Sequence, residues 1–362
     1  MLRLWRQILD HIVPYEAGPP LEVMARELGL PGLVRLSANE NPLGPSTRVV
    51  EAIAREASQV HLYPDGGSTA LRTALAGQLR VRPEHVVVGN GADELLALIA
   101  WAALEPGDEV VIPVPSFEPY TTVVELAGAT IRPSPLARYE TDLDDMRRRV
   151  TARTKAVILC SPHNPATTIV RRQPLVAFLD ALGDDPPLVI VDEAYCDFCD
   201  DPDYPDGVEL LGRYPRLIVL RTFSKIAALA GLRIGYAVAA ADTIDRLNRV
   251  RAPYNVNRLG QVAALAALED HAHWERTRRF IIAEREFLSG ELARRGFTFP
   301  PSHANFLLVR VADAPAARQR LLCAGLIVRD GAAVGFPDHL RISVGTREAN
   351  QRLLVGLEAP RR

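Results

Sequence analysis

The 362-residue sequence has little net charge, few cysteines and no long apolar run. A formal net charge of -2 offers no basic surface of the kind that nucleic-acid phosphates require. Basic clusters such as "MRRRV" and "ERTRRF" lie in helical patterns among acidic residues, which is typical of a solvated helix face. We therefore expect no nucleic-acid partner.

The four cysteines do not indicate a disulfide framework in a chain of this length. Cys196 and Cys199 form a C-x-x-C pattern, but a structural zinc ion needs four ligands and no second close pair accompanies this one. We therefore expect no metal site, and we expect a reduced, intracellular protein.

The N-terminal segment "MLRLWRQILDHIVPYE" has no continuous apolar core, because Arg3, Arg6 and Asp10 interrupt it. We therefore expect no signal peptide. Its apolar residues recur at helical spacing and predict a short amphipathic arm: Leu4, Trp5, Ile8 and Ile12. No uninterrupted apolar run approaches the length of a membrane span. We expect a cytoplasmic protein that does not contact membranes.

Short apolar runs rich in β-branched residues dominate the middle of the chain. They are "HVVVG", "DEVVIPV", "ATIRPSP", "KAVILCS", "PLVIVDE", "RLIVLRTF" and "GYAVAA". Runs that are apolar throughout are typical of strands covered on both faces, as in a mostly parallel sheet. Helical patterns such as "DELLALIAWAAL" separate many of them, so the order predicts an α/β domain with crossover helices.

The pattern changes after about residue 245, where one or two long helices are followed by three short strands, "NFLLVRV", "GLIVRD" and "LRISVG". This favours a smaller α+β lobe that also recruits the N-terminal residues. We expect a large cofactor-binding domain over residues 40–245 and a small domain formed by residues 1–39 and 246–362. The sequence has no internal repeat and no low-complexity linker.

A glycine-rich turn, "GNGADELL", joins a strand that ends at Gly89 to a helix that begins near Asp93. The unpaired N–H groups and the positive dipole end of a helix suit a phosphate. The alternative is an ordinary turn in which Asp93 caps the helix.

Polar or aromatic residues follow three other strands: Phe117 in "VPSFEPY", Asn164 in "SPHNPA", and Asp192 with Tyr195 in "VDEAY". Open α/β sheets bind ligands at this carboxyl edge. A carboxylate in an apolar setting needs a partner, which a protonated ring nitrogen can supply. The alternatives are core packing for Phe117, an Asn-Pro turn for Asn164 and a helix cap for Asp192.

Lys225 follows the strand "LIVLRTF", between Ser224 and the apolar segment that leads to Arg233. An amine in a partly desolvated pocket near other cations deprotonates readily and can form an imine with an aldehyde. The alternative is a surface lysine in a loop. Taken together, the anion cradle, aromatic ring, carboxylate, phenol, lysine and arginine match the groups that pyridoxal phosphate requires.

The sequence resembles the fold-type I, pyridoxal-phosphate-dependent aminotransferases of the histidinol-phosphate aminotransferase branch. The matching motifs are "SANENPLGPS", "YPDGGSTALR", "GNGADELL", "SPHNPA", "VDEAY", "RTFSKIAALAGLRIGY", "APYNVN", "ANFLLVR" and "LRISVGTREAN". The resemblance runs nearly end to end. It implies an aspartate-aminotransferase-like α/β fold with a mostly parallel seven-stranded sheet flanked by helices, and a smaller α+β domain.

The resemblance also implies roles for single residues. Lys225 would bind the cofactor aldehyde covalently and move the substrate proton, and Asp192 would keep the pyridine nitrogen protonated. Tyr195 and Asn164 would hydrogen-bond the ring oxygen, and Phe117 would stack on the ring. The residues implied at the cofactor phosphate are Ala92, Asp93, Ser224 and Arg233, with Tyr63 supplied by the other subunit of a homodimer.

The implied substrate contacts are Arg341, Arg329, Asn41 and Tyr15. The implied reaction is transamination between histidinol phosphate and 2-oxoglutarate, or in the biosynthetic direction between glutamate and imidazoleacetol phosphate, with ping-pong kinetics. The alternatives are an aromatic amino-acid aminotransferase, a threonine-phosphate decarboxylase or a natural-product enzyme on the same scaffold. A non-catalytic regulatory domain is disfavoured, because the family motifs begin by about residue 37 and Lys225 is present.

One loop departs from the family pattern. The family commonly has Asn-Pro-Thr-Gly, whereas this chain has Asn164-Pro165-Ala166-Thr167, preceded by His163. Because this loop shapes the pocket, the change affects expectations about the substrate more than those about the cofactor.

Overall fold

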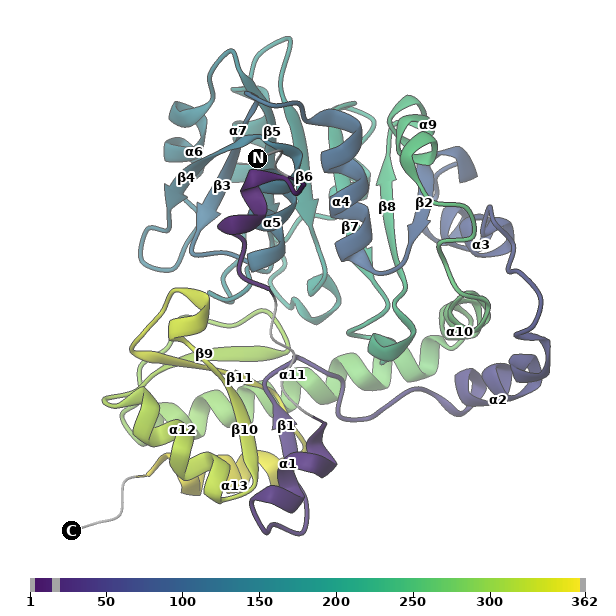
Figure 1. Ribbon diagram of the computed structural model, residues 1–362. Coiled ribbons are helices and arrows are strands. Elements are labelled where there is room, and N and C mark those ends of the chain that lie inside the picture. Colours follow the sequence, from purple (N-terminus) through teal and green to yellow (C-terminus); the bar gives the residue numbers. More distant parts are fainter. Residues whose placement is uncertain (1–3, 15–19, 359–362) are drawn as a thin grey trace.

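A computed structural model describes residues 4–14 and 20–358, and in that part of the chain the strands form two sheets (Figure 1). The larger sheet has seven strands in the order β2-β8-β7-β6-β5-β3-β4. All pairs are parallel except those of β8, which runs antiparallel to β2 and β7. The strands are β2 (Val86–Gly89), β3 (Glu109–Val114), β4 (Thr130–Pro135), β5 (Thr154–Cys160), β6 (Leu188–Asp192), β7 (Leu217–Thr222) and β8 (Gly235–Ala239).

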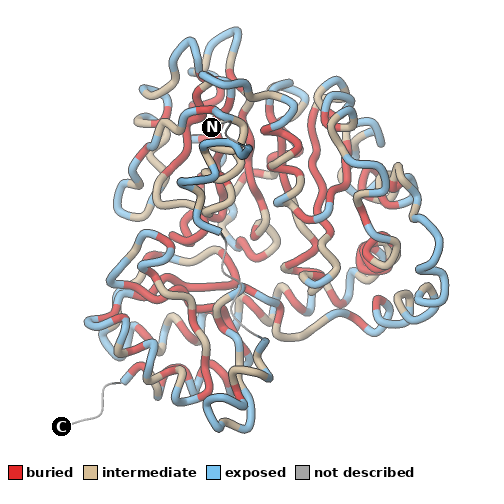
Figure 2. The backbone as a smooth tube through the Cα atoms, in the orientation of Figure 1, coloured by how far each residue is buried: buried red, intermediate tan, exposed pale blue. Residues whose placement is uncertain are grey.

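The central strands of this sheet are buried on both faces, as their continuous apolar sequences predict. In β5, Val157 and Leu159 join one core, whereas Ile158 and Cys160 join the core on the opposite face. This alternation follows from the two-residue period of a strand. In Figure 2 the buried trace accordingly runs along the strands, while the connecting loops at the periphery are exposed.

Helices cover both faces of the seven-stranded sheet (Figure 1). One face packs against α4 (Ala92–Ala103), α5 (Glu118–Ala127) and α9 (Ala241–Val250). The helices that contribute to the core on the other face are α2 (Thr47–Glu56), α3 (Thr69–Leu79), α6 (Leu143–Arg149), α7 (Arg172–Asp180), α8 (Gly207–Leu210) and α10 (Arg258–Leu268). This arrangement confirms the predicted α/β class.

The smaller sheet has four strands in the order β1-β10-β11-β9. They are β1 (Val34–Leu36), β9 (Phe306–Arg310), β10 (Leu326–Asp330) and β11 (His339–Ser343). The N-terminal strand β1 pairs in parallel with β10, so the N-terminal part of the chain joins this sheet. Its helices are α1 (Leu21–Glu27), α11 (His271–Arg294), α12 (Ala314–Cys323) and α13 (Arg347–Leu357).

One apolar core runs without a break from the seven-stranded sheet through α10 and α11 to the smaller sheet. Helix α10 lies after the predicted boundary at residue 245, and α2 lies before that boundary. The two helices nevertheless pack against each other. The division into residues 40–245 and the remainder therefore stays a prediction.

The predicted amphipathic arm is only a 3-10 turn, η1 (Gln7–Asp10), and it lies beside α5. Leu4 and Trp5 are exposed, so their helical spacing does not reflect packing within this chain. The remaining 3-10 turns are η2 (Ala57–Gln59), η3 (Pro83–His85), η4 (Cys196–Phe198), η5 (Ala230–Leu232) and η6 (Ala332–Val334). Among the described residues, no helix is both long enough and apolar enough to cross a bilayer.

Candidate active site

The carboxyl ends of five strands of the larger sheet surround a cavity of roughly 260 Å³. The smaller sheet closes it with Arg341 of β11, and residues 37–40 line it from the segment after β1. Ten residues predicted from the sequence line this cavity: Ala92, Asp93, Phe117, Asn164, Asp192, Tyr195, Ser224, Lys225, Arg233 and Arg341. Most of them come together because parallel strands present their carboxyl ends at one edge, while Arg233 precedes the antiparallel strand β8 and Arg341 comes from the smaller sheet.

Lys225 follows β7, and its Nζ donates a 3.2 Å hydrogen bond to the carbonyl oxygen of Ala38. Burial of the amine, together with the positive charges of Arg341 and Arg233, lowers the pKa of Lys225 to about 8. Roughly a tenth of the amine is therefore unprotonated at pH 7, far more than for an ordinary lysine, and this is the form that attacks a carbonyl carbon.

Asp192 is the last residue of β6 and is 4% exposed. Its Oδ1 accepts a 3.0 Å hydrogen bond from the backbone N–H of Ala194, and its Oδ2 accepts one of 2.6 Å from the hydroxyl of Tyr120. Burial raises the pKa of Asp192 to about 6, against the opposing effect of these two donors. The carboxylate is therefore largely ionised at neutral pH and can hold a buried cation.

Tyr195 presents its hydroxyl to two amides. Asn39 Nδ2 donates to it at 3.1 Å, and Asn164 Nδ2 lies 3.5 Å away. Burial raises the pKa of Tyr195, so the phenol stays protonated. Asn164 Oδ1 accepts a 2.8 Å hydrogen bond from Arg341 Nη1, which connects the two sheets.

The first turn of α4 forms an anion cradle with Arg233. Gly91 caps the helix with φ +83°, and a Cβ at this position would lie 2.5 Å from Arg233 Nη2. Only glycine allows the guanidinium to approach so closely. Arg233 also bonds Asp93 Oδ2 at 3.1 Å and Ser224 Oγ at 3.4 Å. The helix N–H groups, hydroxyl and guanidinium are the donors that a phosphate requires.

Phe117 lines the cavity directly before α5. Its ring packs edge-on against Tyr120, with centroids 5.5 Å apart and an interplanar angle of 83°. Tyr120 in turn bonds Asp192. One segment thus supplies an aromatic wall of the cavity and a donor to the carboxylate.

The sequence comparison agrees with this arrangement. The sequence model described as "Aminotransferase class I and II" matches residues 31–357. The chain belongs to this family.

Known aminotransferases resemble the chain over nearly its whole length. A histidinol-phosphate aminotransferase of Caldicellulosiruptor saccharolyticus is 39% identical over 98% of this chain and 99% of its own. A histidinol-phosphate aminotransferase from Sinorhizobium meliloti, solved in complex with pyridoxal-5'-phosphate, has a TM-score of 0.89 and 29% identity, covering 99% of this chain and 97% of its own. The aspartate aminotransferase from Thermus thermophilus with maleate has a TM-score of 0.82 and 26% identity, and the match covers 98% of this chain and 100% of that one. These likenesses confirm the predicted fold.

Three predicted site residues of this aminotransferase that the structure describes do not line the cavity, namely Asn41, Arg329 and Tyr63. Asn41 lies beside it, and its Nδ2 bonds the carbonyl oxygen of Ile226, next to the catalytic candidate Lys225. Arg329 forms a 3.2 Å ion pair with Glu118. Tyr63 is 78% exposed and stacks on Tyr254. Tyr15 lies outside the described residues.

The polar side chains of the cavity that were not predicted include Tyr120 and Asn39, both of which contact predicted site residues. Residues three positions apart lie on the same face of a helix, so Tyr120 is expected on the same face as Phe117. This spacing could have identified Tyr120 as a cavity residue. Asn39 adopts φ +57°, a conformation that asparagine tolerates, and its backbone N–H bonds the hydroxyl of Ser343 in β11. Nothing in the local sequence indicates that contact.

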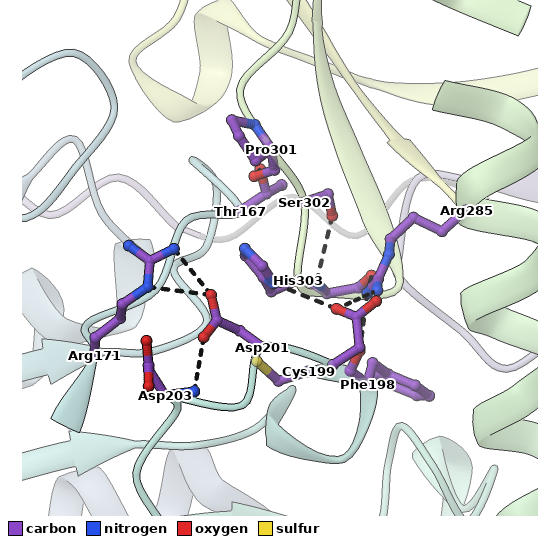
Figure 3. A network of polar contacts seen from close by, with 12 residues as sticks. Thr167, Arg171, Phe198, Cys199, Asp201, Asp203, Arg285, Pro301, Ser302 and His303 are labelled. Carbon is purple, nitrogen blue, oxygen red and sulfur yellow. Dashed lines mark hydrogen bonds and ion pairs between the residues drawn. The ribbon is translucent and has the colours of Figure 1, made fainter. Parts of the chain in front are cut away.

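The loop that departs from the family pattern is held by a buried network. Thr167, at the family's glycine position, has φ +69°, which is rare for a β-branched residue. Its hydroxyl lies 3.0 Å from the carbonyl oxygen of Pro301, and its own carbonyl accepts from the N–H of His303 at 3.1 Å (Figure 3). Thr167 thus adopts a backbone conformation that glycine adopts without strain. The hydrogen bonds to Pro301 and His303 hold Thr167 in this conformation.

The same network reaches α11 through Arg285, which is 4% exposed (Figure 3). Arg285 donates to the carbonyl oxygens of Phe198 at 2.8 Å and Ala304 at 3.1 Å, and it pairs with Asp200. His163, buried in the loop, accepts from the N–H of Ala166 at 3.2 Å, and burial lowers its pKa to about 4. A neutral imidazole therefore supports the turn that carries Asn164.

Proposed function

We propose that this chain is a pyridoxal-phosphate-dependent aminotransferase that exchanges the amino group between histidinol phosphate and 2-oxoglutarate, in the biosynthetic direction from glutamate to imidazoleacetol phosphate. The observation that carries the proposal is the placement of Lys225, Asp192 and Arg341 around one cavity. The names of the full-length relatives support the choice of substrate.

The residues of the cavity fit pyridoxal 5'-phosphate at each of its ends. The first turn of α4, Ser224 and Arg233 would hold the phosphate, and Asp192 would hold the ring nitrogen. Phe117 would cover the ring. When bound, the cofactor supplies an aldehyde that condenses with amines and a ring that accepts electrons from the substrate.

Each side chain contributes a defined part of the reaction. Lys225, with its lowered pKa, would accept the proton from the substrate Cα on its Nζ and donate it again. Asp192, ionised above about pH 6, would hold a protonated ring nitrogen. Tyr195 and Asn164, whose polar groups lie 3.5 Å apart, would hydrogen-bond the ring oxygen. Arg341 binds the anionic end of the substrate.

The proposal includes a homodimer in which Tyr63 completes the site of the other subunit. Tyr63 and Tyr254 stack with centroids 4.6 Å apart while both are exposed. Val60 and Leu62 extend this exposed apolar surface. Such a patch is typical of a surface that another chain covers. Cytoplasmic localisation stays a prediction from the sequence.

A substrate screen tests the function. Purified, cofactor-loaded protein is given 2-oxoglutarate with histidinol phosphate, phenylalanine, tyrosine or threonine phosphate, and glutamate formation and CO₂ release are followed. We expect glutamate formation to be fastest with histidinol phosphate. Turnover of phenylalanine without turnover of histidinol phosphate, or release of CO₂ from threonine phosphate, would refute the assignment.

A further inference from the structure

Two arginines face each other across β10 and β11. Arg329 and Arg341 are direct partners in this antiparallel pair. Residues directly opposite in such a pair lie on the same face of the sheet, where like charges destabilise each other. Arg341 lines the cavity beside Lys225. The paired central strands β10 and β11 therefore favour a negatively charged group near these two arginines.

Glu118 supplies such a charge from the other sheet. Its Oε1 lies 3.2 Å from Arg329 Nη2, although the two residues are 211 positions apart in the sequence. Glu118 follows Phe117 directly, and Phe117 lines the cavity. The ion pair therefore lies beside the cavity and spans the two halves of the site.

The pair is accessible to competing anions. The side chain of Glu118 is 43% exposed and that of Arg329 is 25% exposed. Ion pairs with this much solvent contact are weak and exchange readily, because water and salt screen them. An arriving phosphate would compete with Glu118 for Arg329 and would be repelled by its carboxylate. The repulsion is larger for a doubly charged phosphate than for a singly charged carboxylate.

We propose that Glu118 is a specificity-determining residue, which acts by competing with the anionic end of the substrate for Arg329. This inference rests on the proposed function, in which that anionic end is a phosphate bound by Arg341, and it adds Arg329, the direct partner of Arg341 across β10 and β11, to the same end of the site. Glu118 lowers the affinity of the site for anions, and the substrate must displace it. A residue that acts in this way sets how strongly the enzyme prefers a phosphate-bearing amine over one without a phosphate.

The test compares the cofactor-loaded wild type with Glu118→Gln, using inorganic phosphate as the probe. Loading with the cofactor occupies the cradle at α4, so that added phosphate reports on the substrate end. We expect Glu118→Gln to bind phosphate about twofold to fivefold more tightly in calorimetric titrations, the range for one exposed ion pair. We expect the KM for histidinol phosphate to fall by a similar factor, with the KM for histidinol unchanged.

Two matched variants make the result specific. Glu125→Gln removes the same charge two turns further along α5, and we expect it to behave as the wild type. In an Arg329→Gln background, Glu118→Gln should have no further effect, because its partner is gone. Unchanged or weaker phosphate binding in Glu118→Gln, or an equal gain in both backgrounds, would overturn the proposal. The phosphate titration decides this even if the wild type does not turn over histidinol phosphate, an outcome that refutes only the proposed function.

Discussion

The hydroxyl of Tyr120 lies 2.6 Å from Oδ2 of Asp192 and donates a hydrogen bond to it in a fully buried setting. The backbone N–H of Ala194 bonds the other carboxylate oxygen. Both donors stabilise the charged form of a carboxyl group whose pKa is raised by burial. Tyr120 thereby helps to keep Asp192 ionised at neutral pH.

We expect Tyr120→Phe to raise the pKa of Asp192 and to weaken its hold on the cofactor ring nitrogen. Loss of a hydrogen bond to a charged group costs about 1.5–3 kcal/mol, which corresponds to roughly tenfold or more in the affinity for pyridoxal phosphate. Equilibrium titration of the apoprotein measures this affinity, and Tyr214→Phe, which removes a solvent-exposed hydrogen bond to Asp180 outside the cavity, is the control. Equal affinities of Tyr120→Phe and the wild type would contradict this role.

The lowered pKa of Lys225 predicts a pH dependence of cofactor loading. Only the unprotonated amine condenses with an aldehyde, and its pKa is about 8. The rate of reconstitution of the apoprotein should therefore rise with pH and level off above about pH 8. Stopped-flow absorbance provides the measurement. A rate that continues to rise towards pH 10.5, the ordinary value for lysine, would show that the amine is not perturbed.

The same shift predicts a stability change in Lys225→Met. In the wild type the folded pKa is depressed, so the unfolded chain binds more protons between about pH 8 and 10.5, and stability rises with pH in that window. Below pH 8 the buried ammonium destabilises the apoprotein. We expect Lys225→Met to raise the midpoint of thermal unfolding at pH 7, and this gain to shrink by pH 10.5. A gain that is independent of pH would point to packing instead.

Thr167 provides a test of the loop that departs from the family pattern. Thr167→Ala keeps a side chain at φ +69° and loses the hydroxyl contact to Pro301, so we expect a loss of about 1 kcal/mol. Thr167→Gly loses the same contact but removes the backbone strain, so it should be less destabilised than Thr167→Ala. Urea denaturation of both variants gives the order. The reverse order would show that strain at this position is negligible.

The dimer proposal predicts complementation between two inactive variants. Tyr63→Phe leaves Lys225 intact, and Lys225→Ala leaves Tyr63 intact. If Tyr63 serves the partner's site, a mixed dimer contains one site with neither change, and mixing and refolding should restore up to about half of the activity per mixed dimer. Activity of the mixture that equals the sum of the separate variants would contradict a shared site.

The elements that the sequence predicts are those fixed by local pattern. The central strands β5 and β6 of the larger sheet are nearly continuous apolar runs, because burial on both faces requires such a run, whereas the edge strand β4 is mixed in sequence and largely unburied. Strand β1 (Val34–Leu36) was not predicted, because three residues are too few to show the two-residue alternation of a strand. Its pairing partner, β10, lies nearly 300 positions further along the chain. The η1 turn was predicted as an amphipathic arm, since helical spacing cannot reveal what a face packs against.

The residues of the site likewise fall into those that local sequence pattern predicts and those that it does not. Lys225 and Asp192 follow strands, and the edge of a parallel sheet brings such residues together without further information. Helical spacing from Phe117 could have revealed Tyr120 but not its contact with Asp192, 72 positions away, and no local pattern indicates that Asn39 contacts Tyr195, 156 positions away. Arg329 is expected at the substrate, but its neighbours in the sequence give no sign of the ion pair with Glu118, 211 positions away.

The attachment of the cofactor to Lys225 is the central claim, and the chain allows an unusually clean test because Lys155 is its only other lysine. Borohydride reduction of the cofactor-loaded protein, followed by peptide mapping with mass spectrometry, identifies the modified side chain. The account predicts one pyridoxyl group per chain, on the peptide that contains Lys225, and the same result in Lys155→Arg. A pyridoxyl group on Lys155, or none on Lys225 after full reconstitution, would contradict it.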